Sequence, residues 1–176
     1  GGREMLGDFY RVFSRNMRDL GSPVHSFKWV KAVVDAFGAN AKTVVVYKGN
    51  LPVGTGIILM DQNTATVPWA STIREFNRLS PNMLLYWNFL EFAADHGCTS
   101  FDFGRSTPHE GTYAFKKQWG AKPAPLSWYR YNDNPAFRNN TPQNGSFRKT
   151  VEGIWQRLPL RAANTLGPHL RKYISR

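Results

Sequence analysis

The chain has little cysteine and no long apolar run. Its single cysteine, Cys98, excludes an internal disulfide and a zinc site built on several thiolates. The four histidines show no metal-ligand spacing. No apolar stretch approaches the ~20 residues that cross a bilayer, and no signal peptide is recognisable at the start. We therefore expect a cytoplasmic protein without a metal centre.

Acidic residues are scarce compared with basic ones. Lysine and arginine total 23 against 12 aspartates and glutamates, and the formal net charge is +11. This excess indicates an anionic partner, which is a phosphorylated small molecule, a nucleic acid or an acidic membrane surface. From Phe137 onward Glu152 is the only acid, so much of the excess belongs to the C-terminal region.

The chain also lacks an initiator methionine, which predicts that it is part of a longer product. Its 176 residues, 41% of them hydrophobic, are enough for one globular domain with a core. We expect that domain over residues 1–131. An Asn-, Pro- and Gly-rich linker over 132–146 and a basic amphipathic helical tail over 147–176 follow it.

Hydrophobic periodicity predicts an α+β fold in which a mixed, mostly antiparallel sheet is flanked by helices. Two helices come first, with Leu20, Phe27 and Phe37 facing inward and Ser26 capping the second. A helix capped by Ser80 is apolar almost all round, which predicts the most buried helix. The expected helices cover 6–20, 27–37, 81–96, 147–158 and 160–174, the last interrupted at Gly167 and Pro168. A further short helix is expected after Glu110, ending at Gly120. The expected strands cover 42–48, 51–60, 64–71, 98–104 and 126–131.

The strand expected over 98–104 delivers polar residues to its carboxyl end, where ligand sites of α/β folds often lie. Arg105 suits bidentate binding of phosphate or carboxylate, or else it pairs internally with Asp102 or Glu110. Asp102 either orients Arg105, accepts a proton from an attacking amine, or holds backbone amides. Adjacent helical lysines lie about 100° apart. At most one of them therefore faces a ligand, and we expect that one to be Lys116.

Other polar and aromatic residues are weaker candidates. Trp69 either stacks on a sugar or base or packs in the core, and Asn82 is expected to line a cleft. Arg74 and the N-terminus of the helix over 81–96 suit a phosphate group. His25 is either a base or a polar surface residue.

Several motifs resemble the FemAB-like branch of the GNAT superfamily found with exosortase/PEP-CTERM systems of Gram-negative bacteria. The most specific are Phe101–Ser106 and Phe115–Gly120, joined by Pro81–Trp87. The stretches Arg18–His25 and Val67–Ser71 match as well, and the resemblance covers roughly residues 8–131.

The resemblance implies the C-terminal lobe of a two-lobe enzyme, with a second GNAT-like lobe upstream. Fem enzymes transfer an amino acid from aminoacyl-tRNA to a peptidoglycan precursor. We therefore expect an acyl- or aminoacyltransferase acting on an anionic, lipid-linked precursor of the cell envelope or of exopolysaccharide. Arg105, Ser106 and Lys116 would bind the substrate, with Asp102 as the catalytic group.

Three questions stay open from the sequence. The donor is either acyl-CoA or aminoacyl-tRNA, because residues 71–81 lack the Gly-rich pyrophosphate loop usual in GNAT proteins. The alternative function is a non-catalytic lobe that binds substrate or RNA. The tail stripe of Ile154, Trp155 and Leu158 either lies on the inner face of the cytoplasmic membrane or docks on a protein surface.

Overall fold

The structure is a computed structural model that describes residues 1–127 and 145–174. The chain divides into two compact units. The first joins Gly1–Gly104 with Val151–Arg176, and the second is Arg105–Thr150. The division expected from the sequence, at 131 and 146, lies largely outside the described residues and stays a prediction.

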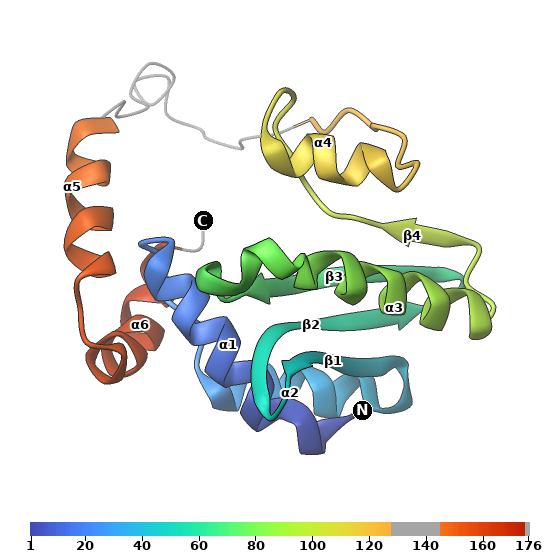
Figure 1. Ribbon diagram of the computed structural model, residues 1–176, viewed down its shortest axis with the longest axis horizontal. Helices are drawn as coiled ribbons and strands as arrows, with labels where there is room; N and C mark the ends of the chain where they lie inside the picture. The colour runs from blue at the N-terminus through green and yellow to red at the C-terminus, as the bar shows by residue number, and fades with distance from the viewer. Residues whose placement is uncertain (128–144, 175–176) are drawn as a thin grey trace, which may run out of the picture. The chain divides into compact units, whose positions relative to one another are not determined.

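A four-stranded sheet organises the first unit (Figure 1). The strand order is β1-β2-β3-β4, with the first three antiparallel and β4 parallel to β3. The predicted α+β fold with a mixed sheet is therefore confirmed. The strands are β1 (Ala41–Lys48), β2 (Leu51–Asp61), β3 (Thr64–Thr72) and β4 (Ser100–Asp102). The helices are α1 (Leu6–Asp19), α2 (Phe27–Phe37), α3 (Pro81–Asp95), α4 (Gly111–Gln118), α5 (Gly145–Gln156) and α6 (Leu160–Ile174), with short 3-10 helices η1 (Arg3–Met5), η2 (Gly38–Asn40) and η3 (Arg74–Leu79).

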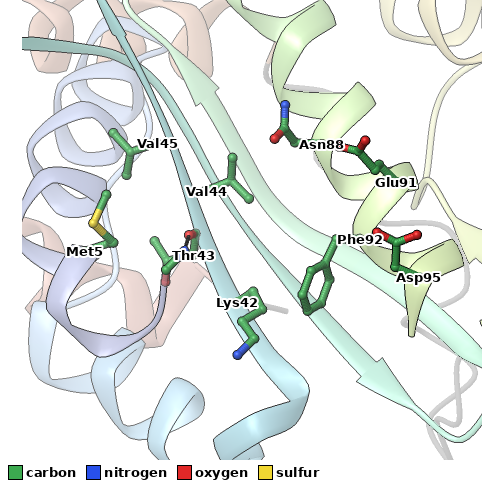
Figure 2. A pocket seen from close by; sticks show the side chains of 10 residues that line it. Met5, Lys42, Thr43, Val44, Val45, Asn88, Glu91, Phe92 and Asp95 are labelled. Carbon is green, nitrogen blue, oxygen red and sulfur yellow. Dashed lines mark hydrogen bonds between the residues drawn. The ribbon is translucent and has the colours of Figure 1, made fainter. Parts of the chain in front are cut away.

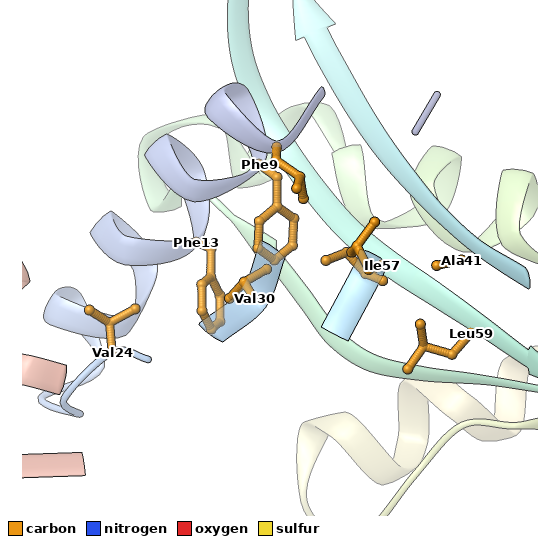
Figure 3. Packing of buried hydrophobic residues seen from close by; sticks show 9 residues of the cluster. Phe9, Phe13, Val24, Val30, Ala41, Ile57 and Leu59 are labelled. Carbon is orange, nitrogen blue, oxygen red and sulfur yellow. The ribbon is translucent and has the colours of Figure 1, made fainter. Parts of the chain in front are cut away.

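Alternating residues of β2 divide the core between the two faces of the sheet, because successive side chains of a strand point to opposite sides. Ile57 and Leu59 pack with α1 and α2, in a cluster that includes Phe9, Phe13 and Val30 (Figure 3). The opposite face packs against α3. Its buried residues include Ile58, Met60, Leu85, Phe89 and Ala93.

A bulge in β3 changes which side its residues face. Ile57 pairs with Trp69 and Leu59 with Thr66, so two residues of β3, Val67 and Pro68, stand opposite Ile58 alone. Val67 belongs to the cluster on the α3 face, whereas Trp69 packs against the cluster on the α1 face. The bulge therefore turns Trp69 toward α1.

Within the first unit, α6 and the end of α5 pack on the part formed by Gly1–Gly104. Trp155 is 7% exposed and Ala163 is 2% exposed. Arg18 donates to the Leu158 carbonyl at 3.2 Å, and Asn164 approaches the Ser14 hydroxyl at 3.4 Å. At Gly21, which has a φ of 72°, an added Cβ would lie 2.8 Å from the Glu152 Cβ.

The structure corrects several details of the sequence reading. Helix α3 is apolar almost all round but is buried on one side only, along the stripe of Pro81, Leu85, Phe89 and Ala93. Leu20, Phe27 and Phe37 are exposed rather than inward. The exposed residues lie at or near helix ends, where apolar spacing no longer meets a neighbouring layer.

Two predictions about helix ends have opposite outcomes. Ser26 caps α2 as expected, with its Oγ accepting from the Trp29 amide at 3.0 Å. Ser80 precedes α3 but makes no side-chain cap, because its backbone is left-handed with a φ of 49°.

The predicted interruption of the last helix is wrong, since α6 continues through Pro168. Gly167 packs against Val24, where an added Cβ would lie 3.0 Å from the Val24 amide nitrogen. The strand expected over 126–131 falls mostly outside the described residues, and positions 126 and 127 are not in a strand.

Candidate functional site

The sheet opens where β3 and β4 separate. They pair only from Thr64 to Thr66, opposite Ser100 to Asp102. Strand β3 continues to Thr72, so its edge beyond Thr66 has no strand partner among residues 1–127 and 145–174. Main-chain amides and carbonyls at such an edge are available to bind an extended ligand.

Asp102 lies at the point of separation, paired with Thr66. Its Oδ1 accepts a hydrogen bond from the Gly104 amide at 2.7 Å, which fixes a tight turn after β4. This is the backbone role that the sequence left open. The side chain is exposed. A carboxylate can accept several hydrogen bonds, so the bond from Gly104 leaves Asp102 able to accept others.

An aromatic cluster lies on the α1 face, beside the separation. The His25 ring stacks on Trp29 with centroids 4.1 Å apart and an interplanar angle of 17°. Trp69 meets Trp29 edge to face at 5.2 Å. The three rings come from the α1–α2 connection, from α2 and from β3. Trp29 is 43% exposed, so the cluster reaches the surface.

Arg171 of α6 joins this cluster. Its Nε donates to His25 Nε2 at 3.3 Å, and a terminal nitrogen donates to the Ser22 hydroxyl at 3.4 Å. Because guanidinium only donates, Nε2 is the unprotonated nitrogen and the His25 ring is neutral, with its proton on Nδ1. Partial burial, and then the Arg171 charge, lower the pKa of His25 below its usual 6.5.

Hydrogen bonds on two sides hold the cluster in place. Tyr10 donates its hydroxyl proton to the His25 carbonyl at 2.9 Å. Asn16 of α1 donates to the buried Ser71 hydroxyl of β3 at 3.1 Å. Burial raises the pKa of the Tyr10 hydroxyl, which keeps that group protonated as a donor. Helix α1 is thus tied both to the connection that carries His25 and to the strand that carries Trp69.

The other strand-end candidates lie in the second unit. Lys116 of α4 donates to the Arg105 carbonyl at 2.8 Å. The Ser106 hydroxyl is buried and has no hydrogen-bond partner within the described part of the chain. The structure thus joins Lys116 to the loop that carries Arg105 and Ser106, through a main-chain atom.

Asn82 and Arg74 are not part of the aromatic cluster. Asn82 is half-buried in the first turn of α3, on the sheet face opposite Trp69. Arg74 is exposed at the start of η3. Neither residue has a ligand-like partner set, and their roles stay predictions.

The connection from β3 to α3 does not fit the diphosphate of coenzyme A. The resemblance to GNAT proteins implies a glycine-rich loop with free amides for that group, and residues 71–81 contain no glycine. Here the amides of Ile73, Phe76 and Ser80 already donate to main-chain carbonyls. Glu75 adds a carboxylate, ion-paired with Arg15. No phosphate step is assigned to this connection.

A shallow cavity of about 360 Å³ lies elsewhere, along β1 and α3 (Figure 2). Lys42 lies over the Phe92 ring there, 5.9 Å from its centroid. Glu91 and Asp95 line the same wall. The cavity follows the edge strand opposite β4 in the sheet order, and no residue predicted from the sequence lines it.

Sequence reasoning missed Trp29 and Arg171 altogether and gave His25 only a minor place. The only local signals were an aromatic residue one turn into a capped helix and an arginine in a basic tail. Among residues 1–127 and 145–174, no group of histidine, cysteine and carboxylate side chains is arranged to hold a metal ion. Within the same part of the chain no helix is long and apolar enough to cross a membrane.

Comparison with known proteins gives one family. A family model described as an acetyltransferase (GNAT) domain matches residues 1–117. A lipid II:glycine glycyltransferase of Staphylococcus aureus is 32% identical over 59 residues. This stretch is 30% of the present chain and spans only 14% of the length of that relative.

Solved structures share the fold at low sequence identity. An aminoglycoside acetyltransferase from an uncultured soil metagenomic sample superposes with a TM-score of 0.60 at 12% identity, over 76% of this chain and 93% of that one. For an acetyltransferase from Agrobacterium tumefaciens described as hypothetical in function, the TM-score is 0.58 at 15% identity, with 75% and 96% of the two chains covered. These likenesses establish the fold alone.

Proposed function

This chain belongs to the acetyltransferase (GNAT) domain family, and we propose that it is the acceptor-binding lobe of an aminoacyltransferase that modifies a cell-envelope precursor. The observation that most supports this proposal is the separation of β3 from β4 beside the cluster of His25, Trp29, Trp69 and Arg171. Acyl transfer is supported by the family. The weak similarity to a lipid II glycyltransferase supports the aminoacyl donor and the lipid-linked acceptor.

In the proposed reaction the acceptor amine or hydroxyl attacks the carbonyl carbon of the donor ester. Asp102, exposed at the point of separation, accepts the proton that the attacking group loses. A main-chain amide of the free β3 edge stabilises the oxyanion of the tetrahedral intermediate. The ester C–O bond of the donor then breaks, and the donor's alcohol group leaves with the proton that Asp102 returns to its oxygen. Most of the rate enhancement comes from holding donor and acceptor together.

The proposed donor is aminoacyl-tRNA rather than acyl-CoA. The β3–α3 connection does not fit a coenzyme A diphosphate, and the net charge of +11 suits an RNA partner. Arg105, Ser106 and Lys116 remain the proposed contacts to the anionic substrate, and Arg74 and Asn82 the weaker ones. The upstream lobe, the exopolysaccharide or PEP-CTERM setting and the non-catalytic alternative stay predictions.

The tail is the proposed contact with the inner face of the membrane. Because Trp155 is buried, this contact would rest on Val151 and Ile154, which are 45% and 61% exposed. Pelleting with vesicles of anionic phospholipid tests it. Replacement of Ile154 by serine should lower the bound fraction, and an unchanged fraction would contradict the membrane contact.

The experiment for the proposed activity compares two labelled donors with one lipid-linked amine acceptor. Radiolabelled glycyl-tRNA should label the acceptor and radiolabelled acetyl-CoA should not. Labelling from acetyl-CoA alone would overturn the choice of donor. An absence of labelling from both, and from other aminoacyl-tRNAs, would overturn the transferase proposal.

A further inference from the structure

Arg171 is a half-buried cation whose two hydrogen-bond acceptors, the His25 ring and the Ser22 hydroxyl, are both neutral. It donates to the His25 ring at 3.3 Å and to the Ser22 hydroxyl at 3.4 Å, and both distances are long for hydrogen bonds. None of the ion pairs between described residues includes it. A guanidinium withdrawn from water and met only by neutral groups is poorly compensated, and an anion beside it would restore the balance.

Helix α6 holds Arg171 in a defined position. On the same helix, Asn164 contacts the Ser14 hydroxyl of α1, and Ala163 and Gly167 are buried. The backbone of Arg171 is therefore already in place when a ligand binds, which favours affinity. Residue 171 also lies outside the family match, which ends at residue 117. The family match therefore does not account for this cation.

The surroundings of Arg171 suit a ring attached to the anion. The His25 ring that Arg171 contacts is stacked on Trp29, which is 43% exposed and meets Trp69 edge to face. A flat apolar ring can bind the body of a sugar, and a neighbouring guanidinium can bind the oxygens of its phosphate. The hydroxyl of Ser22 offers a further polar contact on the same side.

We propose that this cluster binds the acceptor as a phosphorylated sugar, with the phosphate on Arg171 and Ser22 and the sugar ring against Trp29. The inference rests on the proposed transferase function and names the acceptor class for that site. His25 then has a positioning role, because its neutral Nε2 holds the guanidinium in place before the ligand arrives. A bound phosphate takes over the guanidinium donors.

Calorimetric titration of the purified chain with N-acetylglucosamine 1-phosphate tests this binding without a donor. Unphosphorylated N-acetylglucosamine and inorganic phosphate each contain one part of this ligand. Both should bind more weakly than N-acetylglucosamine 1-phosphate. Arg171→Gln should weaken binding of the sugar phosphate by about tenfold or more. Arg161→Gln, at an exposed position on the same helix, removes the same charge and should change it by less than about twofold.

Folding is checked by the Tm of each variant, and Arg171→Lys serves where Arg171→Gln unfolds. The lysine variant keeps the charge but loses the fork, so it should bind more weakly than wild type. Equal weakening by the variants at 161 and 171 would show general charge attraction and overturn the site. So would wild-type protein that does not bind the sugar phosphate at millimolar concentration.

A vesicle arm separates a sugar phosphate from a phospholipid headgroup. Arg171→Gln should leave the pelleting of the chain with anionic phospholipid vesicles unchanged, and a loss of pelleting would reassign Arg171 to the membrane. The proposed function is tested separately. Transfer activity without sugar-phosphate binding would overturn this inference alone, and binding without transfer would overturn the proposed function alone.

Discussion

Two polar regions of the first unit differ in how their charged groups are held. At the end of β4, Asp102 is exposed and bonded to one backbone amide. In the aromatic cluster, Arg171 is half-buried and bonded to side chains that come from another segment of the chain. An exposed carboxylate held by its own turn suits proton transfer at an open strand edge. A half-buried cation beside aromatic rings suits recognition, since its interactions are less screened by water.

The largest expected effect comes from removing the proton acceptor without disturbing the turn. Asp102→Asn keeps an oxygen for the Gly104 amide, so the Tm should stay within about 1 °C while transfer falls about a hundredfold. Rates and thermal melts of the variant check both parts. A transfer rate within about twofold of wild type would show that Asp102 only holds the turn. The two regions would then not differ in function as described.

Gly56→Ala should disturb the aromatic cluster by displacing the strand that carries Trp69. An added Cβ would lie 2.6 Å from the Phe89 ring and 2.7 Å from the Trp69 carbonyl. We expect about 3 kcal/mol of destabilisation and a Tm lower by roughly 5–10 °C. Gly7→Ala is the matched control, because no atom lies within 4 Å of the added Cβ in helix α1, and it should stabilise slightly. A Tm for Gly56→Ala equal to that of the control would contradict the packing described.

The pH dependence of stability sharpens the account of His25. The pKa of His25 is lowered in the folded chain, so the unfolded chain takes up a proton first as the pH falls. The stability linked to His25 is therefore fully present above its usual pKa of 6.5 and is lost as the pH falls through 6.5 toward the folded value. Among ionisable groups, Arg171 hydrogen-bonds to the His25 ring and Tyr10 to the His25 carbonyl.

His25→Gln should flatten the dependence between about pH 7.5 and pH 5.5, as measured by urea unfolding at several pH values. Arg171→Gln should flatten it partly, because it removes only the smaller of the two causes. An unchanged slope in His25→Gln would show that another group carries the dependence.

The smallest expected effect distinguishes the paired lysines of α4. Lys116 donates to the Arg105 carbonyl, whereas Lys117 is exposed. Lys116→Gln should lower the Tm by roughly 1–3 °C, since a hydrogen bond to a charged group at the surface is worth about 1 kcal/mol or less. Lys117→Gln should leave it within error. Equal effects of the two replacements would remove the distinction between them.

Local patterns in the sequence predicted most of the fold. Strand alternation and turn residues located β1 to β3, and Ser26 was recognisable as a cap because capping depends on near neighbours. The exposure of Met83, Leu84 and Trp87 on α3 was not predictable. Apolar residues surround that helix, and only tertiary packing decides which stripe is buried.

The candidate site was predictable only where it is contiguous in sequence. Asp102 is the last residue of its strand, and Trp69 lies near the end of another. The contact between His25 and Arg171 joins residues 146 positions apart. No local pattern indicates such a contact. The bulge at Val67 and Pro68, which turns Trp69 toward α1, depends on pairing with β2, and Pro68 alone marked only an irregular strand.

The central claim, that the acceptor is held at the aromatic cluster, is tested most directly by kcat/KM for the acceptor in a matched pair of tryptophan variants. Trp29 and Trp87 are 43% and 56% exposed, on helices at opposite faces of the sheet. Trp29→Ala should lower kcat/KM about tenfold, mainly through KM, and Trp87→Ala should change it less than about twofold. Equal values for Trp29→Ala and wild type would contradict the account.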